Sequence, residues 1–127
     1  MNDEERERQG LAGDIASADR FLLVCRGRPV GLFEANVSDD DSSERGWCFD
    51  YYVSKLSSNG TSWCEVDGGQ YWDYETPMDL LVDILQCLAW DADAAVALSR
   101  GEFDEIVADP RLAYDTARLA VAIETVG

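Results

Sequence analysis

Apolar residues in the first half of the chain either alternate with polar ones or form short continuous runs, which is typical of β-strands. Residues 21–25 and 30–37 flank a turn rich in arginine, glycine and proline, so we expect them to form a hairpin. Residues 47–56 alternate, and Asn59-Gly60, a frequent two-residue hairpin turn, leads into residues 61–66. The pattern therefore predicts two antiparallel hairpins.

The Asn59-Gly60 turn predicts the register of the second hairpin. A two-residue turn places Leu56 opposite Trp63, Val53 opposite Val66 and Tyr52 opposite Asp67. One face is then apolar and forms the core, with Phe49, Tyr51, Val53, Cys64 and Val66. The other face is acidic and aromatic, with Asp50, Tyr52, Ser54, Leu56, Trp63, Glu65 and Asp67. A slip of one residue would exchange the two faces.

The second half of the chain is predicted to be mainly helical. After a turn at Gly68-Gly69 and a short edge strand over residues 70–75, Thr76 and Pro77 begin a helix that extends to about Trp90. Asp93 is expected to cap a short helix ending near Arg100, and a further turn covers residues 102–108. The last helix, beginning at Asp109-Pro110, should bury Leu112, Thr116, Leu119, Ala120 and Ile123.

Together these elements predict an α+β domain, with an antiparallel sheet of four to five strands followed by three or so helices packed on one face. We expect residues 1–10 to be a flexible, charged N-terminus, Asp14 to cap a short helix through Asp19, and residues 11–127 to form a single domain. The N-terminus has no apolar segment of a signal peptide, which favours a cytoplasmic location.

The net charge of the chain restricts the kinds of partner that the protein can bind. The chain has 26 acidic and 10 basic residues, a formal net charge of −16. Such a field repels nucleic acid and anionic membranes and attracts basic surfaces. The segment between Lys55 and Arg100 has no basic residue, and its acids are spaced comparably to the phosphates of a nucleic-acid strand; they are Glu65, Asp67, Asp73, Glu75, Asp79, Asp83, Asp91 and Asp93.

The residues needed for common catalytic chemistry are missing from the sequence. There is no histidine, which excludes a Ser-His-Asp triad, a Cys-His pair and the usual zinc sites, and there is no glycine-rich phosphate loop. The four cysteines lie too far apart for a zinc knuckle, so we expect inert thiols, with a disulfide between two of them as the alternative. We therefore expect no enzyme, no cofactor and no metal site.

The leading hypothesis is an acidic inhibitor that binds, stoichiometrically, a basic protein that normally holds DNA or RNA. In size, charge and lack of catalytic motifs the chain is similar to phage-encoded anti-CRISPR and anti-restriction proteins, although the similarity covers no motif. The expected partner-binding residues are Asp50, Tyr52, Trp63, Glu65, Asp67, Trp72, Asp73, Glu75, Asp79 and Asp83, because acids interleaved with exposed aromatics suit an interface.

Two alternatives fit the same composition. The first is an immunity protein or antitoxin that neutralises a cognate basic toxin. The second is a housekeeping domain of a salt-adapted organism, whose acidity has no specific partner. Exposed aromatics on an edge strand would also permit a homodimer.

Overall fold

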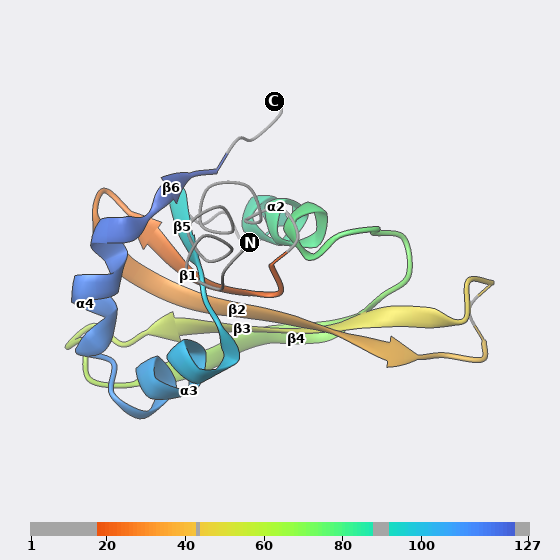
Figure 1. Ribbon diagram of the computed structural model, residues 1–127, viewed down its shortest axis with the longest axis horizontal. Coiled ribbons are helices and arrows are strands. Elements are labelled where there is room, and N and C mark those ends of the chain that lie inside the picture. Colours follow the sequence, from red (N-terminus) through yellow and green to blue (C-terminus); the bar gives the residue numbers. More distant parts are fainter. Residues whose placement is uncertain (1–17, 43, 88–91, 124–127) are drawn as a thin grey trace, which may run out of the picture.

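The computed structural model describes residues 18–42, 44–87 and 92–123, which form an α+β domain around one antiparallel sheet (Figure 1). The predicted α+β class is confirmed. The flexible segment 1–10, the cap at Asp14 and the end of the helix predicted to reach Trp90 lie outside the described residues. The elements are β1 (Arg20–Cys25), β2 (Arg28–Asp39), β3 (Trp47–Leu56), β4 (Trp63–Tyr71), α2 (Pro77–Cys87), β5 (Ala94–Ala97), α3 (Arg100–Ala108), α4 (Leu112–Thr116), the 3-10 helix η1 (Ala117–Leu119) and β6 (Val121–Ala122).

The sheet has six strands in the order β4-β3-β2-β1-β5-β6, rather than the four to five expected. The additional strands, β5 and β6, lie in the second half of the chain, which was predicted to be mainly helical. Asp93 does not cap a helix; β5 follows it and pairs with β1 in the middle of the sheet, Ala95 opposite Leu23. Alanine favours helices, but pairing and burial in the sheet override that weak propensity here. The further turn expected over residues 102–108 is part of α3, which begins at Arg100, with Ser99 and Glu102 forming a capping box.

The first hairpin forms as predicted, except that β2 begins at Arg28, so the turn expected over residues 26–29 is confined to Arg26 and Gly27. β1 and β2 pair from Arg20 opposite Glu34 to Cys25 opposite Arg28. Arg26 and Gly27 form the turn with φ values of 52° and 79°, a left-handed conformation that glycine adopts without steric strain. The long β2 strand continues to Asp39 and pairs with β3 from Gly31 onward.

The second hairpin differs from the prediction at Val66, and this difference changes the face on which the following side chains lie. Leu56 pairs with Trp63 and Ser54 with Glu65, as expected, but a β-bulge leaves Val66 without a partner. Val53 then pairs with Asp67, and Tyr52 with Gly68. The bulge reverses the side-chain alternation beyond it, so Glu65 and Asp67 lie on opposite faces of the sheet.

The turns around β4 also differ from the prediction. The chain reverses through a loop over residues 57–62, longer than a two-residue turn, in which the Ser57 amide donates to the Ser62 carbonyl. Gly68 and Gly69 do not turn the chain. They lie inside β4, which continues to Tyr71, so residues 70–75 form no separate strand.

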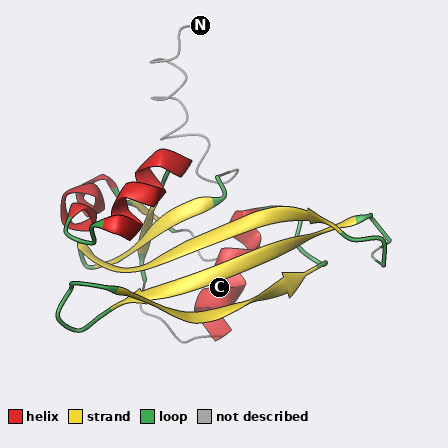
Figure 2. Ribbon diagram, turned by 90° about the horizontal axis from the view of Figure 1, so that it is seen from below, coloured by secondary structure: helices red, strands yellow, loops and turns green. Residues whose placement is uncertain are grey.

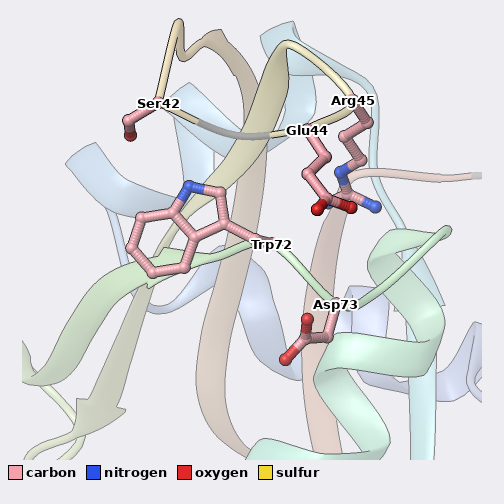
Figure 3. Close-up of a pocket in the computed structure, with 5 residues that line it drawn as sticks. All are labelled: Ser42, Glu44, Arg45, Trp72 and Asp73. Carbon is pink, nitrogen blue, oxygen red and sulfur yellow. The ribbon is translucent and has the colours of Figure 1, made fainter.

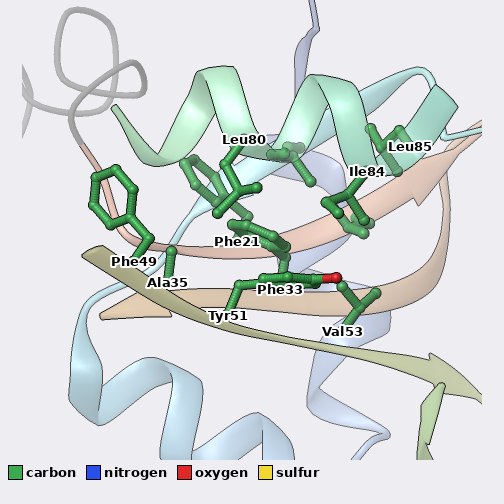
Figure 4. Packing of buried hydrophobic residues seen from close by; sticks show 12 residues of the cluster. Phe21, Phe33, Ala35, Phe49, Tyr51, Val53, Leu80, Ile84 and Leu85 are labelled. Carbon is green, nitrogen blue, oxygen red and sulfur yellow. The ribbon is translucent and has the colours of Figure 1, made fainter. Parts of the chain in front are cut away.

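One face of the sheet is covered by α2. Leu80, Leu81, Ile84 and Leu85 of the helix are buried against side chains of β1, β2 and β3 (Figure 4). A row of aromatic rings extends this cluster, and the centroids of successive rings lie 5.4 to 6.3 Å apart. In order, the rings are Phe21, Phe33, Tyr51, Tyr71 and Tyr74. Burying each aliphatic side chain stabilises the fold by about 1.5–3 kcal/mol, so this cluster is the main core.

The opposite face is covered at one end by α3, α4 and η1, so the helices pack on both faces and not on one. Leu22, Val24, Leu32 and Val96 form this second cluster with Ile106, Ala113 and Ala117. The predicted burial of the last helix was wrong for two of its residues, whereas Thr116, Ala120 and Ile123 are partly buried. Leu112 and Leu119 are 42% and 63% exposed, whereas Ala113 and Ala117, four residues apart, face the sheet.

The residues expected at the C-terminal end of that helix adopt other structures. The α-helix ends at Thr116, one 3-10 turn follows, and Val121–Ala122 pairs with β5. Among the described residues, no helix is both long enough and apolar enough to cross a lipid bilayer.

Candidate functional site

The helices on the second face leave much of β2, β3 and β4 uncovered. Figure 2 shows this face, with the helices gathered at one end and the long strands bare over the remainder. We call the uncovered part the open face; it carries Asn36, Asp50, Tyr52, Ser54, Glu65 and Gln70. The register explains the grouping, because Asn36 pairs with Asp50, Asp50 with Gln70, and Ser54 with Glu65.

Asp50, Tyr52 and Glu65 lie together on the open face, as the sequence predicted. The Tyr52 ring is 46% exposed, although it also contacts the backbone at Gly68, where an added Cβ would lie 3.2 Å from the ring. Glu65 is exposed and Asp50 half-buried. An exposed tyrosine between two carboxylates is well suited to an interface with a basic surface.

The boundary of the open face is marked by Arg20. Its guanidinium lies 3.8 Å from Glu34 and donates to the Asn36 side chain at 3.1 Å. Glu34 is thereby neutralised beside the helices. Asp50 and Glu65, farther across the sheet, have no such partner within the described residues.

Asp67 does not belong to the open face. Because of the bulge it lies on the α2 side, where the Tyr51 hydroxyl donates to its carboxylate at 2.8 Å. Burial of the ring, followed by this hydrogen bond, raises the pKa of Tyr51 far above its ordinary value, so the hydroxyl remains a donor. The prediction that Asp67 shares a face with Glu65 was wrong for this reason.

Trp63 makes contacts within the protein. Its indole N–H donates to the Ile106 carbonyl at 2.8 Å, and the half-buried ring packs against the second cluster. The ring therefore fastens β4 to α3. This contact gives Trp63 a structural role at the helix-covered end of the face.

Trp72 lies at the opposite end, just beyond β4, and is 43% exposed. Its indole N–H donates to the carboxylate of Asp40, which follows β2. Since β3 lies between β2 and β4, this bond spans the end of β3, where Cys48 is buried. The hydrogen bonds from Ser42 and Trp72 lower the pKa of Asp40, and burial raises the pKa of the Cys48 thiol.

A pocket of about 390 Å³ adjoins Trp72 (Figure 3). It is lined by Ser42, Glu44, Arg45, Trp72 and Asp73. The arginine holds the pocket in shape, because its guanidinium stacks on Trp47 at 3.6 Å and donates to the carbonyls of Trp47 and Tyr74. Its remaining nitrogen, Nη2, is buried without a hydrogen-bond partner among the described residues.

The other predicted acids follow β4 onto the α2 side. Asp73 and Glu75 are exposed in the connection to α2, and Asp79 is exposed in the first helical turn. Asp83, one turn later, is half-buried and accepts a hydrogen bond from the Tyr74 hydroxyl. These acids and the open face thus lie on different sides of the sheet, and β4 is the element between them.

None of the seven predicted acids forms an ion pair within the described part of the chain. The ion pairs there join Arg20 to Asp19 and Glu34, and Arg111 to Asp109. Asp67 and Asp83 accept hydrogen bonds from tyrosines, and Asp73 lines a pocket with Arg45 without forming an ion pair with it. The negative field of the seven acids is therefore not cancelled locally.

Several residues of the site were not predicted from the sequence. Asn36 and Gln70 join the open face, and Asp40 and Arg45 fix the pocket. A signal for Asn36 was present, since Glu34, Asn36 and Ser38 alternate with apolar residues along β2. The roles of Asp40 and Arg45 depend on contacts 29 to 32 residues distant in sequence, which local patterns do not encode.

Neither metal chemistry nor relatives supply a further clue. Across residues 18–42, 44–87 and 92–123, no three His, Cys, Asp or Glu side chains are grouped to hold a metal ion. No protein-family model matches the chain, and no significant match was found among curated proteins or solved structures.

Proposed function

We propose that this protein is an acidic binding protein that occupies the basic surface of a partner which normally holds DNA or RNA, and so inhibits it. One observation carries the proposal: carboxylates surround β4 on both sides, and none of them has an arginine or lysine partner among the described residues. Unpaired charge of one sign accelerates association with a surface of opposite sign.

The aromatic residues support the same function. Tyr52 and Trp72 are nearly half exposed, each with carboxylates nearby. The Trp72 pocket, with Glu44 and Asp73, has the chemistry to receive a lysine or arginine side chain, because a cation is attracted both to carboxylates and to an indole face. Such anchors supply the specificity that charge alone does not.

The proposal can be tested by capture from lysate with two variants of equal charge. The face variant is Asp50→Lys with Glu65→Lys. The control is Asp104→Lys with Asp115→Lys, which changes exposed acids of α3 and α4 by the same amount. Immobilised wild-type chain should retain basic nucleic-acid-binding proteins. Adding duplex DNA, RNA or high salt should release these proteins.

We expect the face variant to retain roughly tenfold less of these proteins, because reversal replaces attraction by repulsion at the contact. The control should retain the wild-type amount. Equal retention by wild type and face variant, or captured proteins that neither salt nor nucleic acid releases, would refute the proposed function.

A further inference from the structure

The outer edge of β4, the terminal strand of the sheet, pairs with no other strand in the described ranges of the chain. From Cys64 to Gln70 every residue is exposed except Asp67, which is half-buried. Seven residues of extended chain span about 23 Å. The other edge is β6, which has two residues.

An open edge of this length presents unpaired backbone donors and acceptors, which makes it a template for another strand. Gly68 and Gly69 add to the accessibility, because these two positions of β4 carry no side chain. The backbone groups of this edge can therefore pair with an added strand.

We propose that the partner pairs with β4 through an extended segment rich in lysine or arginine, which becomes a seventh strand of the sheet; this inference rests on the proposed function. Side chains of an added strand alternate between the two faces. Because of the bulge, Glu65 projects on the open face and Asp67 on the α2 side. Basic side chains on both faces of the segment therefore find a carboxylate.

The acids beyond β4 extend this match. Asp50 lies on the open face next to the edge, and Asp79 and Asp83 lie on α2, which covers the other face. A partner that touched only one face would leave Asp50 and Glu65, or Asp67 and Asp83, without contact. A strand at the edge lies beside Glu65 and Asp67, and Asp83 is connected to the end of β4 through Tyr74, whose ring contacts Tyr71.

A second copy of this chain is a poor occupant. Neighbouring strands lie about 4.8 Å apart, and like charges placed opposite each other across strands are destabilising. Pairing two β4 edges would bring the acids of two chains, each of net charge −16, together. The same charges that oppose self-pairing favour a basic segment.

The test uses a capped, labelled eight-residue peptide in which pairs of lysines alternate with pairs of valines, so that lysines occur on both faces. The comparison peptide has the same sequence with N-methyl groups on both edges, which preserves charge but prevents strand pairing. Affinity is measured by fluorescence anisotropy at low salt, and amide hydrogen exchange locates the contact.

We expect the unmethylated peptide to bind at least tenfold tighter and to slow exchange at amides of residues 64–70. Replacing Glu65→Gln and Asp67→Asn together should weaken binding by about five- to tenfold, since each exposed charge pair contributes roughly two- to fivefold. Asp104→Asn with Asp115→Asn should leave the affinity unchanged.

Equal affinity for the two peptides, no binding of either, or protection confined to residues 48–54 or to α2 would overturn the edge proposal. A dimer of the free chain with protected β4 amides would overturn it too, in favour of a second copy. If the edge test fails while the Asp50→Lys/Glu65→Lys variant still loses its captured proteins, the proposed function stands and the partner uses the open face. Failure of both removes the function as well.

Discussion

The position of Asp67 on the α2 side can be tested by a double-mutant cycle with Tyr51. Tyr51→Phe removes the hydroxyl that donates to Asp67, and Asp67→Ala removes the acceptor. The Tyr51 side chain is 4% exposed and the bond is 2.8 Å long, so the geometry is that of a charge-assisted hydrogen bond. Such bonds contribute about 1.5–3 kcal/mol when buried.

Asp67 is half-buried, and solvent reduces that value, so we expect a coupling energy of about 1 kcal/mol between the two changes. Each variant's free energy of unfolding is measured by urea denaturation followed by tryptophan fluorescence. In thermal unfolding the coupling corresponds to about 4 °C for a domain of this size.

The matched control is the same cycle with Tyr52→Phe. Without the bulge Tyr52 would pair with Asp67, whereas the structure pairs Tyr52 with Gly68. Coupling of Asp67 to Tyr52 should therefore be near zero. Coupling to Tyr52 that exceeds the coupling to Tyr51 would refute the bulge, and with it the placement of acids on both sides of β4.

Three further predictions concern stability. Trp63→Phe should lower the free energy of unfolding by about 1–3 kcal/mol in urea denaturation, because the Ile106 carbonyl loses its donor and the smaller ring packs less well; a change below about 0.3 kcal/mol would contradict the fastening role of Trp63. The contribution of Tyr51 to stability should be constant below pH 10 and be lost above it, because the raised pKa of folded Tyr51 makes the unfolded chain release its proton first; Tyr51→Phe should therefore make the alkaline limb of the urea midpoint against pH shallower. The chain should remain folded by circular dichroism at low ionic strength and gain stability modestly with salt, as screening reduces self-repulsion; unfolding at low salt would instead favour the salt-adapted housekeeping domain.

The strands with a strong two-residue period were predictable from sequence. Residues 47–56 alternate between apolar and polar side chains, and β3 has those bounds. A chain reversal within residues 26–29 was also predicted, from the glycine and proline there, but the sequence did not show that Arg26 adopts the left-handed conformation and that Arg28 and Pro29 belong to β2. Local chemistry decides the strand and the reversal, so local patterns reveal both.

The elements that were missed depend on distant neighbours. Asp93 followed by alanines has the local signature of a capped helix, yet burial between β1 and β6 makes Ala94–Ala97 a strand. The bulge at Val66 is likewise invisible in the alternating pattern, although it decides the side of Asp67. Asp50, Tyr52 and Glu65 were placed correctly because they lie in the hairpin at positions that the bulge does not shift.

The bulge also changes what kind of partner the acids suit. Carboxylates gathered on one flat face would fit a broad basic groove. Here they lie on both sides of a sheet, with Asp50 and Glu65 on the open face and Asp67, Asp79 and Asp83 on the side of α2. A rigid groove contacts both sides only by enclosing the edge, whereas an extended basic segment does so by pairing with β4. The arrangement of charge therefore favours a partner whose binding element is a strand, and the N-methylated peptide is the probe that separates this geometry from general electrostatic attraction.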